Sequence, residues 1–328
     1  MSLTSFVSLW QSAVTFGTVI MFGALGEMLT EKSGNLNLGT PGIMYLGSIA
    51  SLIAAFFYES SVANPIAWVG VVLSLVAGVG AAMLGGLLYS FLTITLRANQ
   101  NVTGLTLTIL GSGIANFFGG SLSNLAGGVG QISVAVTSSG YRATTPLANL
   151  GVVGDLFFSY GFLAYVAIII AVVMHFYLNH TRQGLNLRAV GESPATADAT
   201  GINVTRYKYL STCIGAGISG LGGVFYNMNY IRGSWSTDGT IEGLGWLAVA
   251  LVIFSTWKSL NAIWGSYLFG ILYWMYMYID GLTRYSQEIF KMLPYVVTII
   301  VLIITSVRKK KENLGPAALG QSYFREER

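Results

Sequence analysis

The sequence predicts an all-α fold, a polytopic bundle of transmembrane helices. Of its 328 residues, 53% are hydrophobic and only 9% are charged, and the mean hydropathy is +0.64. Soluble proteins are about a quarter charged. Apolar runs of about 20 residues, the length that crosses a hydrocarbon core of about 30 Å, recur along most of the chain, so we expect about 8–10 spans.

The apolar runs define nine predicted crossings or near-crossings. They are residues 6–29, 36–57, 66–96, 102–122, 156–178, 209–231, 244–257, 262–279 and 289–307. The third run is long enough to hide a break, and the seventh is short for a span. Residues 119–154, rich in Gly, Ser, Thr and Ala, are expected to form an outer loop or to re-enter the bilayer.

Two groups of helix-breaking residues indicate broken helices at membrane depth. Gly39, Pro41 and Gly42 are predicted to interrupt the second run, and Gly239, Gly243 and Gly245 to precede the seventh. Irregular backbone is tolerated there only where protein or a water-filled cavity satisfies its polar groups. Paired interruptions in the two halves of a transporter point toward the translocation pathway, whereas simple helix kinks are the alternative.

The distribution of Lys and Arg predicts the orientation. If the basic run 308–311 is cytoplasmic, alternating sides divide the cations unequally. The inner set is Lys32, Arg97, Arg182, Arg188, Arg206, Lys208, Lys258, Arg308, Lys309, Lys310, Lys311, Arg325 and Arg328, and the outer set is Arg142, Arg232, Arg284 and Lys291. Because cations are retained on the cytoplasmic side, we expect a transmembrane domain over residues 1–311 and a cytoplasmic tail over 312–328.

The polar segment 179–208 interrupts the apolar pattern and is predicted to be cytoplasmic. Within it, Ser193 can cap a helix whose first residue is Pro194, and Gly201 supplies a left-handed stop after residues 195–200. The result is a short helix about 10 Å long lying beneath the membrane.

The same segment carries a specific pattern. Residues 181–194 read T-x-x-G-x-x-x-R-A-V-G-E-x-P, and residues 197–204 read A-x-x-x-G-I-N-V. This resembles the coupling segment of bacterial ABC importer permeases of the class that handles ribose, branched-chain amino acids and nucleosides. Residues 23–44 and 96–104 are similar to blocks of the nucleoside-type permeases, except that Pro41 stands where those usually carry Glu. With residues 243–270, the resemblance covers most of residues 20–275.

The resemblance implies a multi-pass subunit of a bacterial plasma-membrane importer that works by alternating access. It implies four kinds of partner: a second permease, expected to be a related but different chain; cytoplasmic ABC ATPases that bind ATP and Mg²⁺; an extracytoplasmic substrate-binding lipoprotein; and a small-molecule cargo. The sequence lacks the phosphate loop G-x-x-x-x-G-K-[ST], so we expect no ATPase site in this chain.

Other chemistries have little support in the residues. Cys213 is the single cysteine, and the two histidines, His175 and His180, are too few for a histidine metal site. Cations at segment ends, rather than in one patch, do not favour nucleic acid. No nucleophile and base pair stands out. We therefore expect a transporter subunit with no catalytic residue, metal or cofactor of its own.

The coupling residues are predicted from the polar segment. Its short helix is expected to insert into a groove of the ATPase, the alternative being an ordinary solvated helix. Arg188 and Glu192 are expected either to fix the segment by ion pairing or to contact the ATPase. The full set is Arg188, Glu192, Ser193, Pro194, Ala197 and Gly201.

The pathway candidates are neutral amides near span ends and aromatic residues. Amides can hydrogen-bond to hydroxyls or base edges, although they also cap helices, and aromatic rings can stack on a flat cargo or form an interfacial belt. The candidates are Asn35, Asn37, Pro41, Gln100, Asn101, Asn116, Trp246 and Phe254.

Nucleosides are the expected cargo, and simple sugars such as ribose or galactose, riboflavin and, less favoured, branched-chain amino acids are the alternatives. Glu27 needs a partner in the first span, such as Lys32 or a backbone amide. The scarcity of other acids within the spans counts against an ion-coupled carrier or a channel, the alternative of another class.

Overall fold

The computed structural model describes residues 3–127, 132–144, 146–149, 151–237, 239–279, 281–308 and 314–324. The predicted all-α class is confirmed: across these residues the structure consists of helices and connecting segments, with no strand. The cations Lys309, Lys310, Lys311, Arg325 and Arg328, which were assigned to the inner side, lie outside the described residues.

The helices follow one another along the chain with short connections. The α-helices are α1 (Leu3–Glu31), α2 (Thr40–Ser61), α3 (Ala67–Ser90), α4 (Gln100–Leu125), α5 (Ala135–Tyr141), α6 (Val152–Phe157), α7 (Phe162–His180), α8 (Arg182–Glu192), α9 (Pro194–Ala199), α10 (Val204–Phe225), α11 (Thr240–Phe254), α12 (Ser259–Trp274) and α13 (Arg284–Arg308). Two π-helices, η1 (Phe91–Thr95) and η3 (Tyr226–Tyr230), and two 3₁₀ turns, η2 (Pro146–Asn149) and η4 (Met275–Tyr278), complete the described elements.

Each of the nine predicted apolar runs corresponds to a helix. Among the described residues, α1, α2, α3 with η1, α4, α7 and α13 are long and apolar enough to cross a membrane, and the chain is a multi-pass membrane protein. The third run has no break before its final π turn, because helix continues from Ala67 to Thr95. The short α11 has 15 residues and is only about 22 Å long.

The first helix forms the centre of the bundle. In its most apolar stretch, 94% of the residues are buried, and the helix packs against α10, α11 and α12. Close approach depends on small residues: a Cβ on Gly26 would overlap the Gly215 carbonyl oxygen and Ser219 Oγ, and one on Gly270 would overlap the Ala13 carbonyl oxygen. Small residues let helix backbones approach within a membrane, where packing rather than hydrophobicity holds helices together.

The predicted helix breaks are misplaced by a few residues. Gly39 caps α2, and Pro41 lies in its first turn, where its missing N–H costs nothing. Gly239 is a left-handed cap with a φ of +76°, but Gly243 and Gly245 lie inside α11. The prediction that Gly39, Pro41 and Gly42 interrupt a helix is therefore wrong, because proline is compatible with a helix start.

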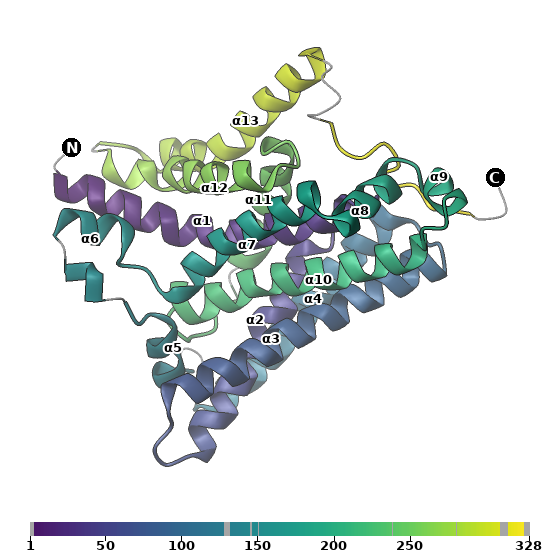
Figure 1. Ribbon diagram of the computed structural model, residues 1–328. Coiled ribbons are helices and arrows are strands. Elements are labelled where there is room, and N and C mark those ends of the chain that lie inside the picture. The colour runs from purple at the N-terminus through teal and green to yellow at the C-terminus, as the bar shows by residue number, and fades with distance from the viewer. Residues whose placement is uncertain are drawn as a thin grey trace.

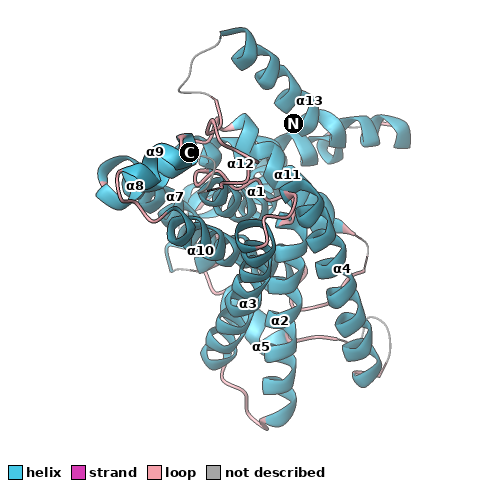
Figure 2. Cartoon of the chain, turned by 90° about the vertical axis from the view of Figure 1, so that its right-hand side faces the viewer, coloured by secondary structure: helices cyan, strands magenta, loops and turns pink. Residues whose placement is uncertain are grey.

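The two ends of the bundle carry different segments. Figure 1 shows the N-terminus and α6 at one end, and α8, α9 and the C-terminal residues at the other. Figure 2, which looks from that second end, again places α8 and α9 beside the C-terminus. We call this second end, with residues 32–39, the α9 end. Within the segment 119–154, the described parts include the end of α4 and the short helices α5 and α6.

Candidate coupling site

The short helix of the polar segment forms as the sequence predicts. Ser193 Oγ accepts a hydrogen bond from the Thr196 amide at 3.4 Å, and Pro194 is the first residue of α9. Gly201 has a φ of +85°, and its amide donates to the Asp198 carbonyl at 3.0 Å. The helix ends at Ala199, one residue before the predicted last residue, Thr200.

A second helix precedes α9 that the sequence analysis did not predict. In α8, Thr181 acts as the cap, and its Oγ1 accepts from the Gly184 amide at 3.0 Å. Gly184, Leu187 and Gly191 are buried, at spacings of three and four residues that place them on one face of a helix. The Thr181 cap and this spacing are therefore sequence features that could have predicted α8. The helix was not predicted because most of the segment is polar.

One face of α9 is seated on the rest of the segment. Ala197 is only 3% exposed and forms a small apolar cluster with Val190 of α8 and Val204 of α10. The Asp198 carboxylate accepts a hydrogen bond from the Tyr323 hydroxyl at 2.8 Å. The orientation of the helix is thus fixed from both sides.

The opposite face of α9 is exposed and carries small side chains. Ala195, Thr196 and Ala199 are all exposed. Small side chains let another surface approach the helix backbone closely. This face, which we call the α9 face, is available to a partner protein.

The C-terminal segment 314–324 ties the α9 end together. The Ala318 amide donates to the Gly191 carbonyl at 3.0 Å, and the Gly320 amide donates to the Gly34 carbonyl at 3.1 Å. These bonds join α8 to the loop between α1 and α2. A movement of α8 would therefore be transmitted to the first two spans.

Arg188 and Glu192 also fix the segment, but not by pairing with each other. The Arg188 guanidinium donates to Asn179 Oδ1 at 3.2 Å, and Glu192 Oε2 accepts from the Ala317 amide at 3.4 Å. Both side chains remain exposed. Their fixing role is a set of hydrogen bonds, and their outer surfaces can still meet a partner.

The loop after α1 lies directly beneath α8. A Cβ on Gly191 would overlap the Lys32 carbonyl oxygen, so only glycine allows this approach. Burial lowers the pKa of the Lys32 ammonium, and the nearby Arg188 lowers it further. The Lys32 backbone is therefore in direct contact with the polar segment 179–208, which we call the coupling segment.

Glu27 has two hydrogen-bond donors at the start of α2. Its Oε1 accepts from the Asn37 amide at 3.0 Å, and its Oε2 accepts from the Thr40 hydroxyl at 2.5 Å. The sequence predicted either Lys32 or a backbone amide as the partner of Glu27. The partner is a backbone amide, that of Asn37. Glu31, one turn later, accepts a hydrogen bond from the Trp257 indole N–H.

Three of the predicted pathway amides are buried at the α9 end, two in the loop between α1 and α2 and one at the start of α4. Asn35 Nδ2 donates to Thr212 Oγ1 at 3.0 Å, and Asn37 Oδ1 accepts from the Gly39 amide at 2.9 Å. Gln100 Oε1 accepts from the Leu36 amide at 2.7 Å. These bonds hold the loop between α1 and α2 in place, and a role in the pathway stays a prediction.

The other pathway candidates are dispersed. Asn101 and Asn116 are exposed on α4, and Trp246 is half-buried on α11. Phe254 packs against Phe269 with ring centroids 5.1 Å apart. Pro41 is buried at the start of α2, where Gly245 of α11 lies against it. The structure does not gather these residues into one site.

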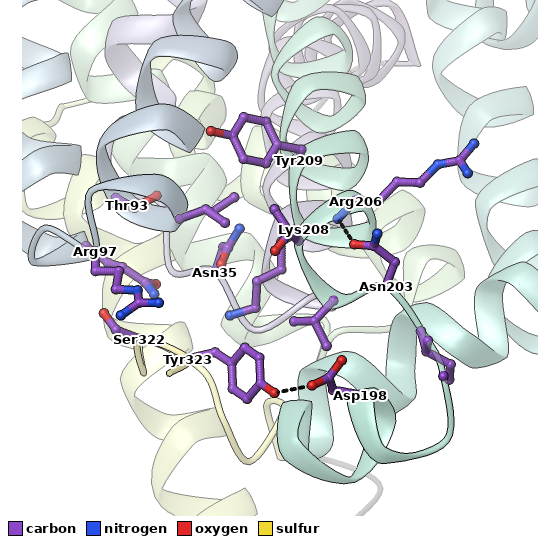
Figure 3. A pocket seen from close by; sticks show the side chains of 16 residues that line it. Asn35, Thr93, Arg97, Asp198, Asn203, Arg206, Lys208, Tyr209, Ser322 and Tyr323 are labelled. Carbon is purple, nitrogen blue, oxygen red and sulfur yellow. Dashed lines mark hydrogen bonds between the residues drawn. The ribbon is translucent and has the colours of Figure 1, made fainter. Parts of the chain in front are cut away.

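A cavity of about 730 Å³ opens between the coupling segment, the base of α10, η1 and the C-terminal segment. Figure 3 shows the Lys208 ammonium between Arg97 and Tyr323, below Asn35. Arg97 and Lys208 entered the sequence analysis only as markers of orientation. Their convergence could not be foreseen, because it depends on how α10 and the end of α3 meet.

The sequence matches a family model over residues 10–302, described as "Branched-chain amino acid transport system / permease component". The chain belongs to this permease family. It covers nearly the whole length of two relatives. The permease is 31% identical to a putative glucose ABC transporter permease protein, TsgC13 of Haloferax volcanii, over 97% of this chain and 98% of the relative. It is 30% identical to the nucleoside ABC transporter permease protein NupC of Lactococcus lactis, over 94% of each chain.

A third relative is the guanosine ABC transporter permease protein NupQ of Bacillus subtilis, to which the permease is 30% identical over 89% of each chain. No solved structure matches the chain. The family match spans every helix from α2 to α12, including the coupling segment.

Proposed function

We propose that this permease carries nucleosides across the membrane as one subunit of an ABC importer, by alternating access driven by separate ATPases. The observation that carries the proposal is the α9 face, which is exposed at one end of the bundle and joined by backbone hydrogen bonds to the loop between α1 and α2. Such an arrangement lets a partner move the spans by moving α9.

We assign the α9 end to the cytoplasm. Cations line its cavities, with Lys32, Arg188 and Lys258 in one and Arg97 and Lys208 in another. Retention of Lys and Arg on the cytoplasmic side supports this orientation and a cytoplasmic C-terminus. Arg142 and Arg232 line a cavity with Gln11 near the other end, which is then outside.

The partners follow from the missing phosphate loop and from the family. ATP and Mg²⁺ bind to cytoplasmic ATPase subunits, which contact the α9 face. A second permease completes the translocation pathway, and an extracytoplasmic lipoprotein delivers the cargo. The exposed apolar side chains of α3 and α4, such as Val72, Leu84 and Ile109, face lipid or this second permease.

Nucleosides are the favoured cargo because two of the three relatives are named for nucleoside or guanosine transport. A sugar is the second candidate, since the relative TsgC13 is named for glucose. Uptake by the assembled complex, measured in competition with uridine, adenosine, ribose and riboflavin, separates these cargoes. Competition by ribose but not by uridine or adenosine would overturn the nucleoside assignment.

The docking role of α9 is tested by Ala199→Arg. The substitution places a long cation on the exposed α9 face without entering the apolar cluster, so the permease should fold and insert while ATP-driven uptake is lost. The matched control is Ala143→Arg, which alters an exposed alanine near α5, far from α9. Undiminished uptake by the Ala199 variant would refute docking through this face, and uptake by purified permease alone down an ion gradient would refute the ABC mechanism.

A further inference from the structure

The cavity beside α9 has the features of a site that binds a small molecule. Its volume of about 730 Å³ lies within the range of about 300–1,000 Å³ that is usual for ligand sites. It is bounded by α9, α10, η1 and the C-terminal segment, all at the α9 end. A ligand there would touch α9, the base of α10 and the C-terminal segment together.

Lys208 gives the cavity a buried cation. The residue is only 3% exposed, and its side chain makes no hydrogen bond or ion pair with any residue that the structure describes. A buried charge is costly unless it is paired. Figure 3 shows its ammonium pointing into the cavity, toward the side on which the Arg97 guanidinium lies.

Arg97 is the second cation of the cavity, and its guanidinium also lies 4.6 Å from the centre of the Phe324 ring. Arg206 lines the cavity by its backbone, but its side chain points away in Figure 3. Among the lining residues that the structure describes, Asp198 carries the carboxylate, and it accepts a hydrogen bond from Tyr323. Lys208 and Arg97 bring positive charge to this cavity, and phosphate is among the anions that Arg and Lys bind in proteins.

Beyond the cations, the cavity offers an unused hydrogen-bond acceptor. Asn35 is 1% exposed, its amide nitrogen is bonded to Thr212, and its Oδ1 has no hydrogen-bond partner among the described residues. A buried acceptor without a partner costs free energy that a ligand N–H or O–H would recover. When a nucleotide's phosphate lies on the cations, the nucleobase or ribose attached to it can supply this donor.

Two aromatic rings flank these groups. Figure 3 shows Tyr209 above and Tyr323 below the Lys208 and Asn35 side chains. Their hydroxyls are hydrogen-bonded. The Tyr209 hydroxyl bonds to the Thr95 hydroxyl at 2.5 Å, and the Tyr323 hydroxyl donates to the Asp198 carboxylate at 2.8 Å. Fixed aromatic rings stack on planar bases, each stack contributing about 1–3 kcal/mol in proteins that bind single-stranded nucleic acid.

We propose that this cavity binds a nucleoside monophosphate from the cytoplasm and thereby restrains the coupling segment. Lys208 and Arg97 hold the phosphate, Asn35 accepts a hydrogen bond from the base or ribose, and a tyrosine ring stacks on the base. Because the ligand bridges α9, α10 and the C-terminal segment, its binding opposes their relative movement. The inference rests on the proposed function in two ways. The proposed function puts the cavity on the cytoplasmic side, and it makes the cargo a nucleoside, of which the ligand is the phosphorylated form.

Binding is tested on the full-length permease in lipid nanodiscs without ATPase subunits, which bind nucleotides themselves. Titration calorimetry with uridine 5′-monophosphate and adenosine 5′-monophosphate should show saturable binding. Inorganic phosphate and unphosphorylated uridine should each bind about tenfold or more weakly, because each lacks one set of contacts. Phosphate binding as tightly as the nucleotides would overturn the roles of Asn35 and the rings.

Variants then locate the site. Lys208→Met and Arg97→Gln should weaken nucleotide binding about tenfold or more, the effect of losing a charge-assisted hydrogen bond, whereas Lys208→Arg should retain it. The matched control is Arg284→Gln, an exposed arginine of α13 outside the cavity. Near-ultraviolet circular dichroism checks that each variant is folded. Absent nucleotide binding, or equal binding by wild type and a folded Lys208→Met variant, would overturn the proposal.

The regulatory part has its own readout in proteoliposomes that contain the assembled complex. Uridine 5′-monophosphate enclosed on the α9 side should slow ATP-driven uptake by wild type. This inhibition should persist in Lys208→Arg, which retains binding, and should be lost in Lys208→Met. A complex that takes up nucleosides but ignores the nucleotide would overturn this inference alone. A complex that takes up no nucleoside would instead count against the proposed function.

Discussion

At the residue scale, a few side chains determine the geometry of the α9 end. Some of their roles could be predicted from the sequence and others could not. The limits of α9 could be predicted because Ser193 and Gly201 act locally, as a cap and a left-handed stop. The partners of Arg188 and Glu192 could not, because Asn179 and Ala317 reach them only in the folded chain. The convergence of Lys208 and Arg97 on one cavity depends in the same way on tertiary packing.

Glu27 provides a prediction at this scale. Its carboxylate accepts hydrogen bonds from the Asn37 amide and the Thr40 hydroxyl, so its role in our account is structural. Glu27→Gln keeps an acceptor for the amide and should cost about 1 kcal/mol of stability, whereas Glu27→Ala leaves a buried N–H unsatisfied and should cost about 1–3 kcal/mol. Thermal unfolding of the purified permease measures both.

Uptake by the same variants distinguishes structure from proton transfer. The Gln variant should take up cargo with the pH dependence of wild type, because no proton moves through this carboxyl group. A folded, assembled Glu27→Gln complex that takes up nothing would show that the carboxyl group carries a proton, and would favour an ion-coupled mechanism.

At the scale of elements, the apolar helices and α9 were predictable, whereas the polar helix α8 was not. Each of the nine apolar runs became a helix because continuous hydrophobicity over about 20 residues leaves few alternatives in a membrane. Helix α8 was missed because its few buried residues, Gly184, Leu187, Val190 and Gly191, lie among polar neighbours. The placement of the segment 314–324 was also beyond the sequence, since backbone hydrogen bonds to Gly34 and Gly191 leave no side-chain pattern.

The C-terminal segment gives the prediction for this scale. Removal of residues 314–328 deletes the hydrogen bonds that join α8 to the loop between α1 and α2. The truncated permease should still insert and assemble, but the cargo taken up per ATP hydrolysed should fall about tenfold, corresponding to ~1.4 kcal/mol of lost coupling. Parallel assays of uptake and ATP hydrolysis in proteoliposomes measure the ratio.

A shorter truncation is the control for this experiment. Removing residues 325–328 alone keeps the bonds of Ala318 and Gly320 and should leave the ratio of uptake to hydrolysis unchanged. If the longer truncation behaves like the shorter one, the segment does not transmit movement, and its contacts serve only to cover the α9 end.

At the scale of the whole molecule, the account requires the two ends of the bundle to lie on opposite sides of the membrane. Single cysteines at Ala143 and Ala199, in a Cys213→Ser background, test this with a membrane-impermeant thiol reagent on intact cells. The cysteine at 143 should be labelled from outside, and the one at 199 only after the cells are opened. Labelling of position 199 in intact cells would reverse the orientation and remove α9 from any cytoplasmic ATPase.

The central claim is that force reaches the spans through α9. The most direct measurement is site-specific photo-crosslinking from position 199 in native membranes, with position 143 as the control and mass spectrometry of the products. We predict that the product from position 199 contains an ABC ATPase subunit and that the product from position 143 does not. A well-labelled position 199 that never captures an ATPase subunit in an assembled, transporting complex would contradict the account.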